Sequence, residues 1–310
     1  MLTYLITDLH FGVRHNSIPF WNYQKDFFTK QLIPDLKAHP GSRLICLGDV
    51  FDSRSTISTY ILTEAQQLLI DTAKCVSEFI IVAGNHDFYS PVEDTYCVLE
   101  PLLGHVPDIR LVVREIYTCG RDVFIPWYCM EKIGPSETSK QYAGRRIFTH
   151  TDAVTNPQEL FTHLYTGHIH TPYNSGLLHN LGSTYPLTMI DANQERYYYV
   201  LNGDNTSPVA IPNKHSLRFW KIDSADTLSR CAPDDYIELM LPAAAVSRES
   251  DKIKNMRNTY KNIRIVFKPE ICESIEIAPE YNLEDFIRAS VPKDLIDKFE
   301  TIHEKIQKTK

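Results

Sequence analysis

Over its first 200 residues the chain alternates short apolar runs with stretches of helical periodicity, and this alternation constrains the fold more than any other feature. Six runs are compact and β-rich, and most are followed by a polar cluster: residues 2–7, 43–47, 79–83, 122–126, 146–149 and 164–166. Between them, apolar residues recur at helical spacing over residues 22–39, 59–76 and 93–103. Pro34 should kink or split the first of these helices. Strands that alternate with helices are typical of an α/β sandwich.

The second half of the chain changes its pattern twice. Residues 176–211 read as short strands and turns, with strands at residues 197–201 and 208–211 that we expect in a second sheet packed on the first. After Pro212, a small α+β domain is predicted from strands at residues 217–222, 236–241 and 262–267 and a helix over residues 243–260. A helical hairpin around Pro292 is predicted for the last residues. The predicted segments are therefore residues 1–212, 213–275 and 276–310.

Composition excludes several classes of protein. Hydrophobic residues make up 43% and charged residues 23%, an ordinary globular mixture. The net charge of −7 is not that of a typical nucleic-acid-binding protein, so any DNA contact must be local. The seven cysteines lack the close spacing of a disulfide framework or zinc ribbon. The apolar runs are far shorter than the ~20 residues that cross a bilayer, and the first residues lack the basic flank of a secretory signal. We therefore expect a cytoplasmic protein without membrane contact.

Side chains that can bind metal follow several of the predicted strands. They occur at five strand ends, in the order Asp8-Leu9-His10, Gly48-Asp49, Gly84-Asn85-His86-Asp87, His150 and Gly167-His168-Ile169-His170. Because α/β proteins place their sites where the loops after the strands converge, we expect these side chains on one rim. Alternate residues of an extended chain point to one side, so each Asp-x-His or His-x-His pair could grip an ion, unless the turn rotates one of the two histidines away.

The types of ligand indicate which metal and which chemistry. Carboxylate, amide oxygen and imidazole together suit octahedral Mn²⁺ or Fe²⁺ better than structural Zn²⁺. With Asp49 as a bridge, seven such ligands can hold two ions ~3.5 to 4 Å apart, the arrangement that hydrolyses phosphate esters. Each motif alone has a plainer explanation as a cap, a turn, a loop or a hydrogen-bonded pair. The ordered combination, each member after a strand, favours a metal centre.

The order D-x-H, G-D, G-N-H-D, H, G-H-x-H resembles the calcineurin-like metallophosphoesterase superfamily. Further segments are similar to the SbcD-type DNA-repair nucleases, and more specifically to the nuclease subunits of phage recombination endonuclease complexes: residues 8–12, 48–52, 125–127, 166–171 and 181–187. The similarity reaches residues 211–215 and beyond them rests on layout alone. It implies an α/β fold, a metallophosphoesterase sandwich of two mixed β-sheets flanked by helices, with a small α+β capping domain and a C-terminal helical hairpin.

The resemblance also implies roles for the site residues. One ion would be held by Asp8, His10, Asp49 and His170, and the other by Asp49, Asn85, His150 and His168. Both would be divalent, with Mn²⁺ favoured over Mg²⁺ or Fe²⁺. His86 would act on the scissile phosphate or its leaving group. Asp52 is the phosphate-proximal candidate, because many cellular relatives have a His at this position and use it to approach the phosphate. A carboxylate cannot donate a hydrogen bond there unless it is protonated.

Two surfaces are candidate binding sites for macromolecules. Between residues 251 and 268, only Asp251 accompanies six basic residues, namely Lys252, Lys254, Arg257, Lys261, Arg264 and Lys268. They form either a DNA-backbone contact or an ordinary solvated helix face. In the tail, apolar residues at helical spacing include the partner-binding candidates Leu295, Ile296, Phe299 and Ile302. Their stripe packs either on this chain's own small domain or on the partner that the resemblance implies, a coiled-coil ATPase of the SMC-like class.

Three functions compete at this stage. The first is a two-metal DNA nuclease, which by resemblance degrades duplex ends 3′ to 5′, cuts single strands and works in a recombination or repair complex, in the host cytoplasm if a phage encodes it. A homodimer within a heterotetramer is left open. The second is a phosphoprotein or nucleotide phosphatase on the same scaffold, and the third is a DNA-end scaffold without catalysis. Trp21, Phe20 and Tyr23 are expected in the core rather than at a lip of the site or in a dimer contact. Neither His163 nor His179 is expected as a ligand.

Overall fold

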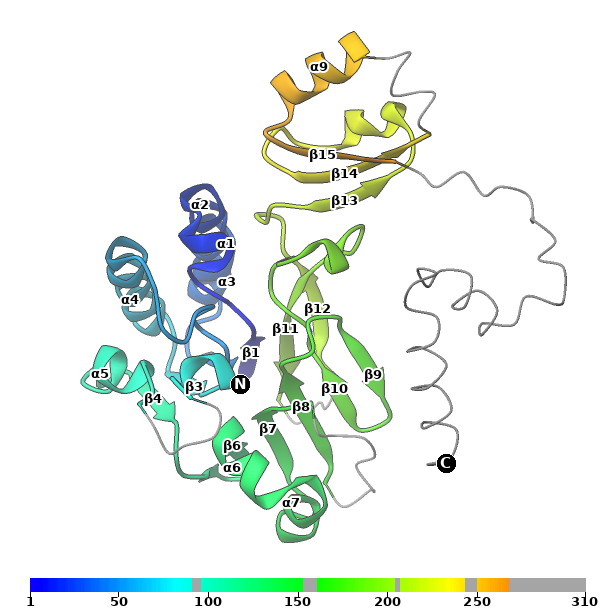
Figure 1. The fold of residues 1–310 in the computed structure, drawn as a ribbon. Helices are drawn as coiled ribbons and strands as arrows, with labels where there is room; N and C mark the ends of the chain where they lie inside the picture. The colour runs from blue at the N-terminus through cyan, green and yellow to red at the C-terminus, as the bar shows by residue number, and fades with distance from the viewer. Residues whose placement is uncertain (91–95, 153–160, 204–206, 243–249, 268–310) are drawn as a thin grey trace, which may run out of the picture. The chain divides into compact units, whose positions relative to one another are not determined.

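The computed structural model describes residues 1–90, 96–152, 161–203, 207–242 and 250–267. Its first sheet has six strands in the order β12-β11-β1-β2-β3-β4 (Figure 1). They are β1 (Leu2–Ile6), β2 (Arg43–Leu47), β3 (Glu78–Val82), β4 (Ile109–Val112), β11 (Tyr197–Asn202) and β12 (Val209–Pro212). Strands β1 to β4 are parallel, whereas β11 pairs antiparallel with β1, and β12 with β11.

The second sheet also has six strands, in the order β5-β6-β7-β8-β10-β9. They are β5 (Tyr117–Cys119), β6 (Asp122–Ile125), β7 (Arg146–His150), β8 (His163–Gly167), β9 (Tyr173–Ser175) and β10 (Leu178–Asn180). Strands β6, β7, β8 and β10 are parallel, and antiparallel strands β5 and β9 close the two edges. Both sheets are therefore mixed, as the fold prediction requires.

One strand assignment from the sequence is wrong. Residues 197–201 and 208–211 were expected in the second sheet, but β11 and β12 extend the first sheet. Strand β1 has β2 on one side only, so its other edge would expose unpaired backbone groups, and β11 covers that edge from Leu2↔Asn202 to Leu5↔Tyr199. The second sheet is built instead from β5 to β10.

Helices cover the outer face of the first sheet. They are α2 (Ile18–Phe27), a π-helical turn (Phe28–Leu32), α3 (Ile33–Ala38), α4 (Thr59–Ala73) and α5 (Leu99–Leu103). Near Pro34 the regular α-helix is interrupted by the π-helical turn that directly precedes α3. Pro34 itself lies in the first turn of α3, where its missing N–H is tolerated. The segment α1 (Val13–Asn16) is a turn in which Arg14 and His15 have left-handed dihedrals.

The helix predicted over residues 93–103 is too long. Residues 96–98 are described and are not helical. Cys97 forms an isolated antiparallel β-bridge with Phe88, and the Tyr89 N–H donates to the Tyr96 carbonyl at 3.0 Å. Residues 91–95 lie outside the described part. Two helices that were not predicted from the sequence follow β6, namely α6 (Trp127–Ile133) and α7 (Pro135–Gln141).

Alternating side chains of each strand enter different cores. Leu5, Ile45 and Ile80 meet Phe124 and Phe148 between the two sheets. Their chain neighbours point the other way, where Ile6 and Cys46 pack with Trp21, Phe20 and the helices, and half-buried Tyr23 packs against the same cluster. The expected core packing of these three aromatic residues is confirmed. The layers are thus helices, sheet, sheet and, behind β6 and β7, helix α6.

A smaller sheet follows residue 213. It has the order β13-β14-β15, with β13 (Phe219–Ile222), β14 (Tyr236–Leu241) and β15 (Asn262–Phe267), accompanied by α9 (Ser250–Thr259). Trp220 packs with Ile237 and Met256 in a separate hydrophobic cluster, and its indole N–H donates to Asp235 at 2.8 Å. The predicted strands and helix agree with this unit, while the three segment boundaries remain predictions. The C-terminal hairpin lies outside the described residues.

A buried cluster of salt bridges joins the two large sheets at the amino ends of their strands. Asp122 at the start of β6 accepts hydrogen bonds from Arg43 at the start of β2 and from Arg146 Nε at 2.7 Å. The side chains of Arg43 and Asp122 are only 5% and 4% exposed. Because the partners come from different sheets, this cluster ties the sheets together at the end opposite the loops after β1 to β3.

We expect Asp122→Ala to lower the free energy of unfolding by about 3 to 5 kcal/mol, because it leaves the buried charge of Arg43 without its main partner. Urea denaturation measures this change. The control is Glu137→Ala, which breaks an exposed pair with Lys140 and should cost about 1 kcal/mol or less. Equal costs for the two variants would contradict a structural role for the buried cluster.

Candidate metal centre

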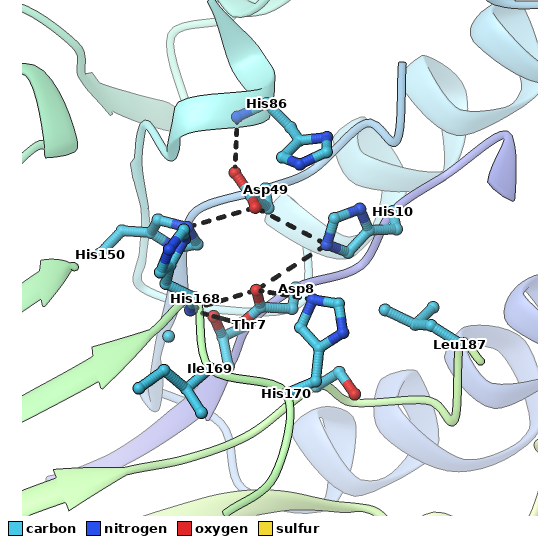
Figure 2. Close-up of polar contacts among 12 residues, drawn as sticks. Thr7, Asp8, His10, Asp49, His86, His150, His168, Ile169, His170 and Leu187 are labelled. Atoms are coloured by element: carbon cyan, nitrogen blue, oxygen red, sulfur yellow. Dashed lines mark hydrogen bonds and ion pairs between the residues drawn. The ribbon is translucent and has the colours of Figure 1, made fainter. Parts of the chain in front are cut away.

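The loops after strands of both large sheets bring the candidate ligands together (Figure 2). Those from the first sheet are Asp8 and His10 after β1, Asp49 after β2, and Asn85 and His86 in the short 3₁₀ turn Asn85–Asp87 after β3. Those from the second sheet are His150 at the end of β7, and His168 and His170 after β8. The predicted rim is therefore an edge that the two sheets share.

The first group of ligands consists of Asp8, His10 and His170, whose ligand atoms all lie within 4.8 Å of one another. Asp8 Oδ1 is 3.8 Å from Nε2 of His10 and 3.8 Å from Nε2 of His170. Two hydrogen bonds fix the orientation of the Asp8 carboxylate, which accepts from the Thr7 hydroxyl at 2.6 Å and from the His168 N–H at 3.1 Å. Thr7 is a supporting residue that the sequence does not reveal, because a lone Thr at a strand end carries no distinctive pattern.

The second group consists of Asp49, His150 and His168. Asn85 faces the same space, with its Oδ1 3.1 Å from His150 Nε2 and 2.9 Å from His168 Nδ1. His150 Nδ1 lies 2.6 Å from the Leu47 carbonyl and must carry the hydrogen there, which leaves Nε2 directed at Asp49 and Asn85.

Asp49 stands between the two groups. Its Oδ2 lies 3.6 Å from His10 Nε2 and 3.2 Å from His150 Nε2, while Oδ1 accepts the His86 N–H at 2.8 Å. One carboxylate oxygen thus faces a histidine of each group. This is the position that a bridging ligand requires.

The donor atoms fit divalent ions in type and in spacing. Ligand atoms lie ~2.0 to 2.2 Å from such ions, so atoms around one ion are separated by ~3 to 4.4 Å, the range seen here. In addition, both ring nitrogens of His10 are buried and make no hydrogen bond, although three carboxylates surround the ring. Nitrogens without partners are costly in a polar core, and an ion at Nε2 would satisfy one of them.

Unusual backbone conformations place these side chains. Asp8, His10, Asp49 and His168 have positive φ angles of 50°, 45°, 51° and 79°. The expectation of extended chain at Asp8-Leu9-His10 is therefore wrong, since both side chains reach the site through left-handed turns. The turn at His168 separates it from His170, and the two serve different groups. Such conformations are strained in residues other than glycine and tend to occur at functional sites.

Two glycines allow the strand ends to approach closely. At Gly84, a Cβ atom would lie 2.3 Å from Asp49 Oδ1, and at Gly48, where φ is +87°, it would lie 2.6 Å from His150 Nδ1. A side chain at either position would displace a ligand. Asp87 connects the same loops, because its carboxylate accepts the N–H groups of Gly84 at 2.9 Å and Val50 at 3.0 Å. The sequence motif contained Asp87 but gave it no role.

Charges in the site shift several pKa values. Burial lowers the pKa of His10, but Asp52, Asp8 and Asp49 outweigh it and raise that pKa to about 10. Burial also lowers the pKa of His150, and Asp49 and Asp8 raise it to about 9. Burial raises the pKa of Asp49, yet His150 and His10 hold it below its usual range. The carboxylates thus favour positive charge around them, as a cation-binding site must.

We expect the metal-free protein to lose thermal stability as pH rises from 6.5 to 9. Because the pKa values of His10 and His150 are raised to about 10 and 9 in the folded state, the folded chain holds more protons than the unfolded chain in this window, and raising the pH favours unfolding. Melting in a chelator at both pH values measures the effect. His150→Gln should reduce the slope; an equal slope in that variant would rule out this histidine as a source.

The other predicted residues lie as follows. Asp52 approaches His10, with its Oδ1 3.2 Å from His10 Nδ1. His163 Nδ1 lies 2.9 Å from His179 Nε2, and both residues are outside the two ligand groups. Lys254, Arg257 and Arg264 are exposed, and Lys261 pairs with Asp234 at 2.7 Å. The side chain of Lys252 and the partner-binding residues Leu295, Ile296, Phe299 and Ile302 lie outside the described part. The DNA and partner contacts therefore remain predictions.

Together, the two-sheet sandwich and this edge define a protein class, the metal-dependent hydrolases of phosphate esters. Residues 1–222 match the calcineurin-like phosphoesterase family, and the chain belongs to that family. Its members bind two divalent metals, which agrees with the two candidate ligand groups. None of the described helices has both the length and the apolar character needed to cross a membrane.

Individual relatives are distant. Exonuclease subunit 1 of Enterobacteria phage T4 is 25% identical over 231 residues, 66% of each chain, so this chain spans slightly less than two thirds of that relative's length. Among solved structures, a novel archaeal phosphodiesterase is matched at 12% identity with a TM-score of 0.36, covering 68% of this chain and 99% of the other. The nuclease MPE of Pseudomonas putida is matched at 13% identity with a TM-score of 0.33, covering 69% and 74%.

Proposed function

We propose that this chain is a DNA nuclease that hydrolyses phosphodiester bonds with two divalent ions, Mn²⁺ in preference to Mg²⁺ or Fe²⁺. The observation that carries this proposal is the position of Asp49 Oδ2, which faces a histidine of each ligand group while its partner oxygen holds the His86 backbone. In this proposal Asp8, His10, Asp49 and His170 hold one ion, and Asp49, Asn85, His150 and His168 hold the other.

The bound ions and two of the chain's own residues would prepare the reaction. The bound ions would supply an acidified water as nucleophile and neutralise charge on the phosphate. Asp49 fixes the spacing between the two groups. His86 Nδ1 lies 2.5 Å from the Asp52 carbonyl and so carries the hydrogen there, which leaves Nε2 to hold a second proton and pass it to the departing oxygen.

The choice of DNA as substrate rests on the sequence motifs and on the phage relative, whose name describes an exonuclease subunit. By the same resemblance we propose 3′ to 5′ degradation of duplex ends, endonuclease activity on single strands and a role in recombination, repair or replication in the cytoplasm, in that of the host if a phage encodes the chain. The exposed Lys254, Arg257 and Arg264 are candidates for contacts with the DNA backbone.

The proposed partner is an SMC-like coiled-coil ATPase, because the relative is a subunit and the tail residues predict an amphipathic surface. Leu295, Ile296, Phe299 and Ile302 are the candidate contacts. Packing of the tail on this chain's own small domain is the competing explanation, and a homodimer within the complex is compatible with either.

The test is digestion of end-labelled duplex and single-stranded DNA by purified protein with Mn²⁺, beside an Asp8→Ala control and with p-nitrophenyl phosphate as a competing substrate. Metal-dependent cleavage of DNA that the control lacks is the expected result, and the label position reveals the polarity. Hydrolysis of the small ester without cleavage of DNA would favour a phosphatase. Binding of DNA ends without turnover of any ester would favour a scaffold.

A further inference from the structure

Asp52 contacts the ring of His10 on the side away from the candidate metal ligands. His10 Nε2 faces Asp8 at 3.8 Å and Asp49 at 3.6 Å, whereas Nδ1 faces Asp52 Oδ1 at 3.2 Å. The His10 side chain is 3% exposed and that of Asp52 is 34% exposed. The two nitrogens of one buried ring thus meet different carboxylates.

Backbone pairing between two loops sets this contact. The loops after β1 and β2 run side by side, with N–H donation from His10 to Asp49 at 3.0 Å, from Phe11 to Val50 at 2.9 Å and from Asp52 to Phe11 at 3.1 Å. A bridge between Phe11 and Phe51 continues the pairing. The spacing of Asp49 and Asp52 in Gly-Asp-Val-Phe-Asp therefore places the second carboxylate beside His10.

Asp52 also touches His86, through its main chain. Its carbonyl oxygen lies 2.5 Å from His86 Nδ1, and the rings of His10 and His86 meet edge to face with centroids 4.9 Å apart. The side chain and the carbonyl of one residue thus face the Nδ1 atoms of two site histidines. In the same way, a main-chain carbonyl, that of Leu47, faces Nδ1 of His150 at 2.6 Å.

We propose that Asp52 is a positioning residue for His10: its carboxylate accepts the Nδ1–H, which fixes the tautomer and directs the Nε2 lone pair at the metal. This inference rests on the proposed metal centre. It replaces the expectation that Asp52 approaches the substrate phosphate, where two like charges would repel each other. In the structure Asp52 Oδ1 lies 3.2 Å from Nδ1, close enough for this contact, although the angle there does not meet hydrogen-bond geometry.

The test is calorimetric titration of the metal-free protein with Mn²⁺, in the absence of DNA. Asp52→Ala should weaken one of the two sites by roughly 10- to 100-fold, the usual effect of removing a group that orients a metal-bound histidine. Asp52→Asn should weaken the same site several-fold less, because its amide oxygen can still accept the Nδ1–H but is a poorer acceptor than a carboxylate. The Mn²⁺ concentration for half-maximal activity should rise by the same factor in each variant.

The control is Asp108→Ala, which removes an exposed carboxylate from the turn before β4 and should leave both affinities unchanged. Wild-type Mn²⁺ affinity in Asp52→Ala, with a raised KM for DNA, would overturn the proposal in favour of a substrate contact. Should the alanine variant fail to fold, Asp52→Asn decides: affinity equal to wild type overturns the proposal. Because the titration uses no substrate, a wild-type protein that binds two ions but cuts no DNA would refute the nuclease proposal and leave this test intact.

Discussion

Asp49→Ala is expected to lower activity on DNA to the level of the metal-free protein and to weaken Mn²⁺ binding at both sites. Asp49 Oδ2 faces His10 at 3.6 Å and His150 at 3.2 Å, so its removal takes one ligand from each proposed ion. The same change removes the acceptor of the His86 N–H. Titration with Mn²⁺ and digestion of labelled DNA measure the two effects.

Two further variants sharpen this prediction. Asp49→Asn keeps the size of the side chain and an oxygen for the His86 N–H, yet it loses the charge, so it should resemble the alanine variant in metal binding. Asp108→Ala, at an exposed site in the turn before β4, should behave as wild type. Substantial activity in Asp49→Ala, or a single Mn²⁺ site in the wild-type protein, would refute the two-metal assignment.

The second large effect is expected from His86→Gln, which should retain both ions and lose roughly 10²-fold or more in turnover on DNA. His86 belongs to neither ligand group, and its backbone N–H, which the substitution keeps, is the part that contacts Asp49. The side chain that is lost is the proposed proton donor. Single-turnover cleavage at saturating Mn²⁺ measures the change.

An activated substrate separates a proton donor from a residue that only shapes the site. A p-nitrophenyl phosphodiester has a leaving group that needs no proton, so the loss in His86→Gln should shrink on it. His105→Gln, which alters an exposed histidine after α5, provides the matched control. If His86→Gln instead loses an ion, His86 is a ligand and the proposed roles must be reassigned.

Some features could be read from the sequence because they depend on local pattern. Apolar runs of strand length with a polar residue at the end predicted β1, β2 and β3 within one residue, and the polar ends predicted where Asp8, Asp49 and Asn85 lie. Both signals are local. An apolar run marks a buried strand, and a polar residue after it marks the carboxyl end of a parallel strand, so a short segment is enough to show them.

Other features depend on contacts between distant segments. No local pattern states that Tyr197–Asn202 joins the free edge of β1, because an apolar strand fits either sheet equally well. The left-handed conformation of Asp8 and His10 was missed for a similar reason: it is imposed by hydrogen bonds to the loop after β2, including Asp8 N–H to the Gly48 carbonyl at 3.1 Å. The contact between Asp52 and His10 follows from that pairing as well.

The division of the ligands between two sheets has a consequence for the proposed ions beyond catalysis. Each ligand group takes residues from both layers, Asp8 and Asp49 from the first and His170 and His150 from the second. A bound ion would therefore act as a removable cross-link at one end of the sandwich, while the Arg43 and Asp122 pair is a permanent one at the other. Folding and metal supply would then be thermodynamically linked, so that starvation for the ion loosens the same edge at which the substrate must bind.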